Sequence, residues 1–164
     1  RGRFPHQGIF QRITTADVEA VDWAMQAADV ERLAARSLGS LSGGERQRAW
    51  IALALAQQPR VLLLDEPTSF LDIAHQVEIM ELLQRLNRDG MTVVAVLHDL
   101  ALAARYTGRV IAMRDGRIAF DGPPAEVFEP VGLGKVFGIA MMVLTDPETG
   151  LPIPIPRSLP TRAG

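Results

Sequence analysis

The stretch Leu41-Ser42-Gly43-Gly44-Glu45-Arg46-Gln47 sets a serine three residues before a glutamate, with two glycines between them. Ser-x-x-Glu is the pattern of a capping box, in which Ser42 accepts a hydrogen bond from a first-turn amide and Glu45 reaches back to the cap. The glycines let a ligand approach the backbone, because no Cβ stands in the way. Strong helix formers follow at residues 49–56. The pattern predicts a helix whose N-terminus can hold an anion, with an ordinary capped helix as the alternative.

Two carboxylates follow the next apolar run. Val61–Leu64 is continuously apolar and is bounded by charge, which predicts a parallel strand buried on both faces. Asp65 and Glu66 come directly after it, and the carboxyl ends of such strands are where open α/β sheets bind ligands. Taken alone, the acidic pair could also be a plain strand-end turn.

A histidine follows a second apolar run in the same way. Residues 73–88 have apolar side chains at three- and four-residue steps, which predicts an amphipathic helix closed by Asp89-Gly90. Met91–Leu97 is then expected to be another buried strand, with His98 directly after it. His75, on the helix, is expected to be a surface or partner-facing residue rather than a ligand.

These stretches, in this order and spacing, resemble the motifs of ATP-binding cassette (ABC) ATPases. Leu41–Gln47 resembles the signature motif, and Val61–Thr68 resembles the Walker B strand with its catalytic glutamate. Ser69-Phe70-Leu71-Asp72 resembles the D-loop, and His98 resembles the switch histidine. Agreement at four ordered motifs is very specific.

The resemblance implies roles for these residues. Asp65 would hold Mg²⁺ directly or through water, Glu66 would polarise the attacking water, and His98 would contact the γ-phosphate or hold the water in line. Hydrolysis of a phosphoanhydride needs positioning and charge stabilisation rather than covalent chemistry. The remaining expected nucleotide contacts belong to the signature and the D-loop: Ser42, Gly43, Gly44, Glu45, Gln47, Ser69 and Asp72.

The resemblance also implies partners. In this family two ATPase subunits sandwich two ATP molecules, so Ser42, Gly43 and Gly44 would contact the γ-phosphate bound by the partner subunit. The resemblance is closest to the ATPases of siderophore, haem and cobalamin importers, because Ala95–Leu100 and Arg105-Tyr106 are similar to stretches of those ATPases. A pair of transmembrane permease subunits and, indirectly, a periplasmic or lipoprotein substrate-binding protein would be partners. The expected location is the cytoplasmic face of the inner membrane, as a peripheral subunit.

Composition limits the alternatives. The chain has 164 residues, no cysteine and a formal net charge of −2, so disulfides, thiol chemistry and a basic nucleic-acid footprint are excluded. No apolar run reaches the roughly 18 residues that span a bilayer, and no secretory signal is visible.

The only lysine is Lys135, in Gly132-Leu133-Gly134-Lys135-Val136. A phosphate-binding P-loop has the pattern Gly-x-x-x-x-Gly-Lys-Ser/Thr, whereas Glu129 stands at the first glycine and Val136 at the hydroxyl position. The chain therefore contains no Walker A motif. We interpret it as the C-terminal part of an ABC ATPase, and we expect the reading frame to extend upstream into a Gly-Lys-Ser/Thr loop.

The expected fold class is α/β: a partial P-loop NTPase fold of the ABC type, with a mainly parallel sheet flanked by helices. Residues 1–40 are expected to be a remnant of the helical subdomain and 41–56 the signature and its helix. Residues 57–130 would be the C-terminal part of the catalytic core, and 131–164 a small extension containing a β-hairpin.

Further local signals complete the expected elements. Thr14 or Thr15 caps a first helix, and a second short helix runs near residues 30–35. A helix over 99–105 is followed by strands 110–113 and 117–120, joined by the hairpin signal Arg114-Asp115-Gly116. Short helices near 122–128 and 131–137 precede a strand pair, 139–144 with 151–155. Gly2–His6 resembles a Gly-Arg-x-Pro segment of the same importers.

Two other functions remain open. One is a soluble ABC ATPase that serves translation or DNA repair, although such proteins usually have tandem cassettes or coiled-coil insertions. The other is a degenerate, non-enzymatic cassette that acts as an interaction module. Intact Asp65, Glu66 and His98 argue against the latter, because a dead site need not keep them.

Overall fold

The computed structural model describes residues 13–157, and the chain divides into two compact units, Arg1–Val96 and Leu97–Gly164. Helices and strands both contribute throughout, which confirms the α/β class. The Gly2–His6 segment lies outside the described residues.

Over residues 13–96, the first unit contains a parallel strand pair, three α-helices and two short 3₁₀ turns, Glu31–Leu33 and Leu38–Ser40. Its elements are α1 (Thr15–Ala27), α2 (Gly43–Leu55), β1 (Val61–Asp65), α3 (Ile73–Arg88) and β2 (Thr92–Val96). Thr14 caps α1, Ser42 caps α2, and α3 has the predicted bounds. The helix predicted near residues 30–35 is reduced to the 3₁₀ turn Glu31–Leu33, whose N-cap Val30 has no side chain that can cap it.

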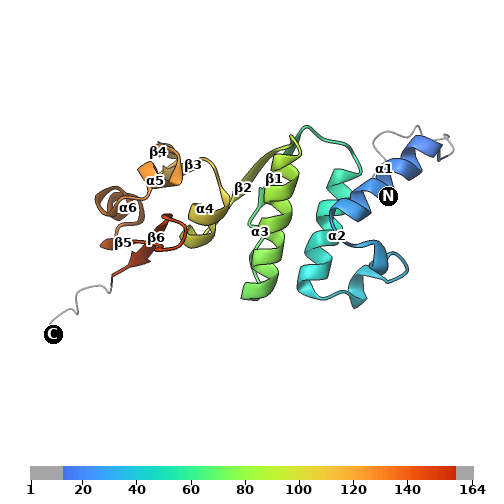
Figure 1. The fold of residues 1–164 in the computed structure, drawn as a ribbon, viewed down its shortest axis with the longest axis horizontal. Coiled ribbons are helices and arrows are strands. Elements are labelled where there is room, and N and C mark those ends of the chain that lie inside the picture. The colour runs from blue at the N-terminus through green and yellow to red at the C-terminus, as the bar shows by residue number, and fades with distance from the viewer. Residues whose placement is uncertain (1–12, 158–164) are drawn as a thin grey trace. The chain divides into compact units, whose positions relative to one another are not determined.

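The helices of this unit pack side by side in a row that begins at the strands. α3 contacts β2, α2 contacts α3, and α1 contacts α2, so that α2 lies between α1 and α3 (Figure 1). Ile51, Leu55 and Ile79 are fully buried. The apolar stripes of α2 and α3 therefore form the core that holds the start of α2 in place.

One prediction about the strands is wrong, since β1 and β2 are not buried on both faces. Leu62 is 4% exposed, whereas its neighbour Leu63 is 73% exposed. In β2, Val94 and Val96 are also exposed, and the parallel register pairs Leu63 with Val94 and Asp65 with Val96. These residues share one face of the sheet because side chains alternate along a strand. Among the described residues of this unit, α3 covers the opposite face.

Over residues 97–157, the second unit contains two antiparallel hairpins and three short helices. Its elements are α4 (Leu100–Tyr106), β3 (Val110–Arg114), β4 (Arg117–Gly122), α5 (Pro124–Val127), α6 (Pro130–Phe137), β5 (Met141–Thr145) and β6 (Pro152–Pro156). β3 pairs with β4, and β5 pairs with β6, as the sequence predicts. The turn at Asp115-Gly116 has positive φ at both residues, 51° and 73°, which is the geometry that Asp-Gly favours in two-residue hairpins.

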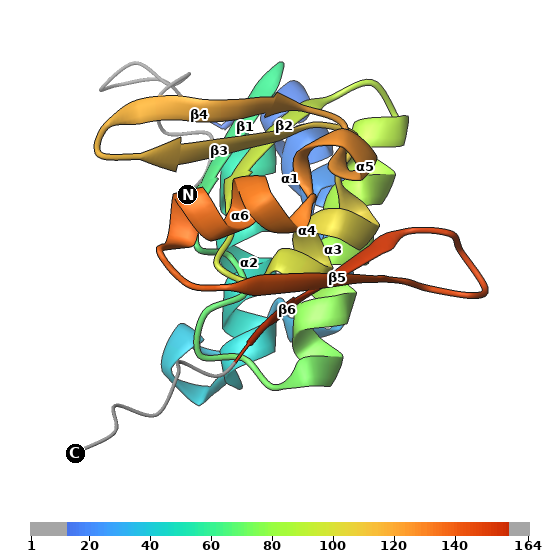
Figure 2. The same ribbon diagram turned by 90° about the vertical axis from the view of Figure 1, so that its left-hand side faces the viewer.

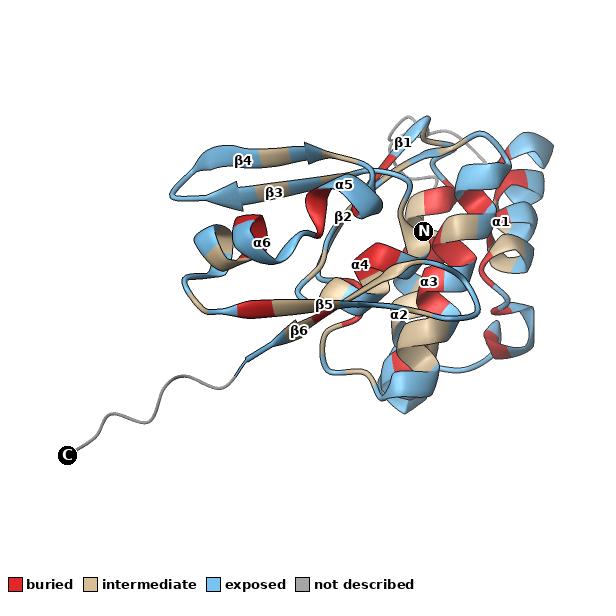
Figure 3. Ribbon diagram, turned by 60° about the vertical axis from the view of Figure 1, so that its left-hand side comes forward, coloured by how far each residue is buried: buried red, intermediate tan, exposed pale blue. Residues whose placement is uncertain are grey.

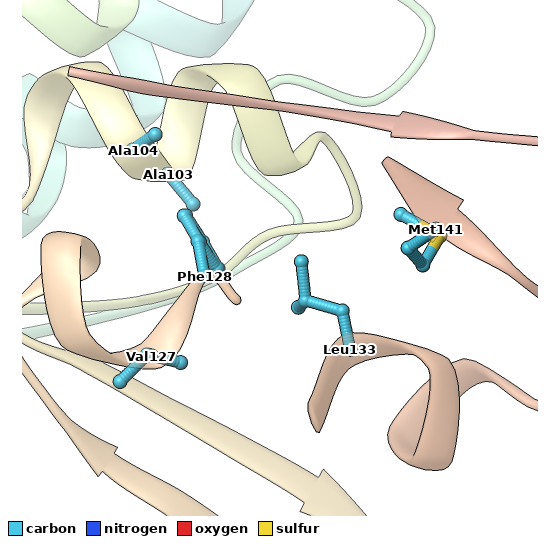
Figure 4. Close-up of a cluster of buried hydrophobic side chains, with 6 residues drawn as sticks. All are labelled: Ala103, Ala104, Val127, Phe128, Leu133 and Met141. Atoms are coloured by element: carbon cyan, nitrogen blue, oxygen red, sulfur yellow. The ribbon is translucent and has the colours of Figure 1, made fainter. Parts of the chain in front are cut away.

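Helix α6 lies between the two hairpins (Figure 2) and contacts β3 and β5. The core of this unit is a cluster that contains Phe128, which directly follows α5, and Leu133, in the middle of α6 (Figure 4). Ala103, Ala104, Val127 and Met141 complete it. By contrast, no residue of β3 or β4 is buried (Figure 3).

Lys135 lies within α6 rather than in a loop. Glu129 caps this helix, and its carboxylate accepts hydrogen bonds from the amides of Val131 and Gly132. A P-loop presents a glycine-rich loop to phosphate. The Gly-Leu-Gly-Lys stretch is therefore an ordinary capped helix, in agreement with the sequence argument.

Candidate functional site

The start of α2 has the predicted capping box. Ser42 is extended, at φ −62° and ψ 169°, and its Oγ accepts from the Glu45 amide at 3.2 Å. Glu45 Oε2 accepts from the Ser42 amide at 2.9 Å. That backbone hydrogen bond, with support from Arg36, lowers the pKa of Glu45. Glu45 therefore stays ionised and holds the turn.

Two arginine side chains, Arg36 and Arg46, form hydrogen bonds or ion pairs with the residues around this turn. Arg36 lies 3.3 Å from Glu45 Oε1 and also donates to the Ser40 carbonyl. Arg46 donates to the Leu41 carbonyl at 3.1 Å. Ser42 and Gly43 remain exposed, Gly44 is buried, and Gln47 is half-buried. An anion that approaches the start of α2 would therefore meet an exposed turn of fixed geometry.

This turn can accept an anion for two physical reasons. The amides of Gly43 and Gly44 are in the first turn, so they have no acceptor within the helix. The helix macrodipole places partial positive charge at the same end. Both effects point outward at the exposed Ser42-Gly43 backbone.

The end of β1 carries the acidic pair. Asp65 and Glu66 are both exposed, whereas Pro67 and Thr68, which follow them in the chain, are buried. Glu66 has φ 47°, a left-handed conformation that costs a non-glycine residue free energy and that often marks functional loops. Ser69 Oγ donates to Glu66 Oε2 at 2.8 Å. The structure thus brings together two of the predicted site residues, Glu66 and Ser69.

Asp72 caps α3 through Oδ1. This oxygen accepts from the His75 amide at 2.9 Å and lies 2.7 Å from His75 Nδ1. The hydrogen bonds from His75 lower the pKa of Asp72. Gln76 donates to the carbonyls of Thr68 and Leu71, at 3.3 and 3.2 Å. The first turn of α3 therefore fixes the loop that connects it to Glu66.

The turn at Ser42, Gly43 and Gly44, which the sequence predicts to belong to the signature motif and which we call the signature turn, packs directly against this loop and against α3. If Gly43 carried a Cβ, this atom would lie 3.3 Å from Leu71 Cδ2. At Gly44 the same atom would lie 2.1 Å from His75 Cδ2. The two glycines are thus in contact with residues Leu71 and His75, which flank Asp72.

His98 belongs to the second unit. It is exposed, follows the last residue of β2 by two positions and precedes Asp99. Asp99 caps α4 by accepting from the amides of Ala101 and Leu102. The cap fixes the backbone directly after His98.

One carboxylate at the end of β1 suits Mg²⁺. This ion commonly takes one or two carboxylates, water and substrate phosphates, and Asp65 offers an exposed carboxylate in such a place. Across residues 13–157 there is no group of three or more acidic or histidine side chains that could hold a metal by itself. Over the same residues, every helix is too short or too polar to cross a membrane.

His75 was expected to be a surface or partner-facing residue, and no role was predicted for Gln76, whereas the structure half-buries both. Both lie in the first turn of α3 and contact the loop after Glu66. Their position within four residues of a capping aspartate was the available signal, since first-turn side chains point back toward the cap. The tertiary contact of His75 with Gly44 left no trace in the sequence.

Comparisons with known proteins agree with this picture. A family model described as ABC transporter matches residues 3–69. The ferric enterobactin transport ATP-binding protein FepC of Escherichia coli K12 is 48% identical over 99% of this chain and 61% of its own length. The iron(3+)-hydroxamate import ATP-binding protein FhuC of Bacillus subtilis 168 is 46% identical over 93% of this chain and 57% of its own.

The fold has solved counterparts as well. An ABC transporter in an inward-facing conformation aligns with a TM-score of 0.86 at 28% identity, over 96% of this chain and 63% of that one. CbiO1 of Clostridium perfringens, part of the transporter complex CbiONQ, aligns with a TM-score of 0.70 at 31% identity, over 82% and 53%. The chain spans about three fifths of the length of the relatives it matches.

Proposed function

This chain belongs to the ATP-binding proteins of ABC transporters, and we propose from this that it supplies its signature turn to the ATP site of a partner subunit and its catalytic carboxylate to a second ATP site. The observation that carries the proposal is the contact between the capped signature turn and the loop that follows the acidic end of β1. That contact joins the two elements on which nucleotide hydrolysis would depend.

The signature turn would bind the γ-phosphate held by a second ATPase subunit. Ser42 Oγ and the amides of Gly43 and Gly44 are suited to this role, because they lie at an exposed helix N-terminus. Glu45 and Gln47 would keep the turn in shape from within the helix. The turn would act in trans, on nucleotide bound by its partner.

The end of β1 would carry the hydrolytic residues. Mg²⁺, when bound, would supply charge neutralisation for the phosphates, and Asp65 would be its protein ligand. Glu66 would polarise the attacking water, and its carboxylate is oriented by the Ser69 hydroxyl. Asp72 would keep this loop joined to α3.

His98 would act as the switch residue. An imidazole N–H can donate to a γ-phosphate oxygen and loses that partner after hydrolysis. Its exposed position directly before a capped helix supports the proposal, since the backbone there is fixed while the ring stays accessible.

The transported substrate would be an iron chelate or haem. This follows from the relatives, which are named for ferric enterobactin transport, iron(3+)-hydroxamate import and hemin import. The partners would then be a second ATPase subunit and a permease pair, with a substrate-binding protein acting indirectly. Such a subunit would work at the cytoplasmic face of the membrane.

The decisive experiment replaces Glu66 by Gln in the longest reading frame that contains these residues, assembled with its permease. Removal of a general base commonly lowers turnover by about 10²- to 10⁴-fold. We expect phosphate release to fall by that factor, while ATP-dependent dimers persist on size-exclusion chromatography, because nucleotide contacts are intact.

Glu81→Gln is the matched control. Glu81 is exposed on α3, so this variant makes the same change of charge away from the proposed site, and its turnover should equal that of the wild type. Wild-type turnover in Glu66→Gln would refute the role assigned to Glu66. An inactive wild-type transporter would refute the proposed function itself.

A further inference from the structure

The two glycines of the signature turn contact side chains of the D-loop and of the first turn of α3. Gly43 faces Leu71, and Gly44 faces the imidazole of His75. A methyl group at position 44 would lie 2.1 Å from Cδ2, 2.7 Å from Cγ and 3.0 Å from Nε2 of that ring. Since real Cβ contacts are essentially never shorter than 3.0 Å, His75 leaves room for glycine alone unless the ring moves.

Movement of the ring would break a hydrogen bond to Asp72. Its Nδ1 lies 2.7 Å from Asp72 Oδ1, and the same oxygen accepts from the His75 amide. This paired contact fixes the imidazole above the first turn of α3, with the opposite edge of the ring turned to Gly44. The His75 side chain is 33% exposed, so two thirds of its surface is already packed.

We propose that His75 is a positioning residue, which sets the distance between the signature turn and the D-loop by filling the space between Gly44 and Asp72. The inference rests on the proposed function, because it assigns to His75 the placement of the turn that would bind phosphate. His75 itself does not contact the nucleotide in this proposal. It acts through Gly44 on one side and Asp72 on the other.

The chemistry of histidine suits such a spacer. A planar ring fills the gap beside a glycine backbone, and its Nδ1–H donates to the carboxylate of a residue in the D-loop. An aliphatic side chain of similar bulk would fill the gap but would lose the hydrogen bond. An asparagine would keep a donor near the position of Nδ1 but would leave the gap partly empty. The two functions of His75 can therefore be separated by substitution.

The first test is a double-mutant cycle on thermal stability, which needs no ATP. Gly44→Ala alone should lower the melting temperature, because the new methyl group collides with the ring. In a His75→Ala background the same change should be neutral or should raise the melting temperature, because alanine is the better helix former. An equal effect of Gly44→Ala in both backgrounds would overturn the proposed contact.

The second test measures ATP turnover by the assembled protein with His75→Leu and His75→Asn. A misplaced phosphate-binding turn should raise KM for ATP and lower kcat/KM, on the order of tenfold or more in His75→Leu. His75→Asn keeps a donor to Asp72 but leaves the gap beside Gly44 partly empty, so it should recover only part of this loss. A role in folding alone would lower the amount of active protein and leave KM unchanged.

The outcomes separate the two proposals. Wild-type KM in His75→Leu, with Glu66→Gln inactive, would overturn the role of His75 and leave the proposed function in place. A wild-type protein without ATPase activity would overturn the proposed function, and the stability cycle would still decide whether His75 holds Gly44 in place. Equal kinetic losses in the Leu and Asn variants would overturn the part of the proposal that depends on Asp72.

Discussion

Ser42 and Thr14 begin their helices with the same pair of hydrogen bonds. Thr14 Oγ1 accepts from the Asp17 amide at 3.2 Å, and Asp17 Oδ2 accepts from the Thr14 amide at 3.0 Å. Only Ser42 is followed by two glycines and is proposed to contact a phosphate. The pair therefore allows the structural role of a cap to be separated from a role in nucleotide binding.

We predict that Ser42→Ala and Thr14→Ala each lower the free energy of unfolding by about 1 kcal/mol, because each removes one side-chain cap. Only Ser42→Ala should also weaken ATP turnover by the assembled protein. Thermal unfolding and phosphate release measured on both variants would test this. If Thr14→Ala lost turnover to the same degree, the effect at Ser42 would have to be attributed to stability.

At the scale of elements, signals from neighbouring residues were sufficient to predict where α1 and α2 begin, where α3 runs and where the chain turns between β3 and β4. The serine and threonine caps, the apolar spacing of α3 and the Asp-Gly turn each depend on residues within a few positions of one another. Burial depends instead on what packs across an element. For this reason the sequence predicted the strand at Val61–Leu64 but not the exposure of Leu63.

The two adjacent leucines of β1 make this difference measurable. Leu62 is 4% exposed on the face that α3 covers, and Leu63 is 73% exposed on the other face. Leu62→Ala should lower the free energy of unfolding of the 164-residue chain by about 2–5 kcal/mol, since it opens a cavity. Leu63→Ala should change it by no more than about 0.5 kcal/mol, as is usual for a surface site. Similar losses from urea unfolding of both variants would contradict the burial pattern.

At the scale of the whole molecule, the order of the motifs predicted the family, but the contacts between motifs could not be read from it. The hydrogen bond from Ser69 to Glu66 joins residues three positions apart, so a sequence pattern could have predicted it. The contact of His75 with Gly44 joins two helices that are separated along the chain by a strand and a loop. It arises only when α2 and α3 pack together, and so it needed the structure.

The share of each relative that this chain covers leads to a last prediction. FepC is matched over 61% of its length, and these 164 residues contain no Gly-x-x-x-x-Gly-Lys-Ser/Thr pattern. We expect the reading frame upstream of Arg1 to encode such a loop, because ATP bound only from the signature side would lack its phosphate cradle. Sequencing the upstream region tests the first part.

The second part is tested by activity. Phosphate release should be undetectable for the 164-residue chain alone and should be measurable for the extended protein. It should then be lost again when the lysine of the new loop is replaced by alanine, because that side chain reaches the β- and γ-phosphates. Turnover by the 164-residue chain alone would contradict this division of the site, because it would mean that the signature turn and the end of β1 suffice to hold ATP.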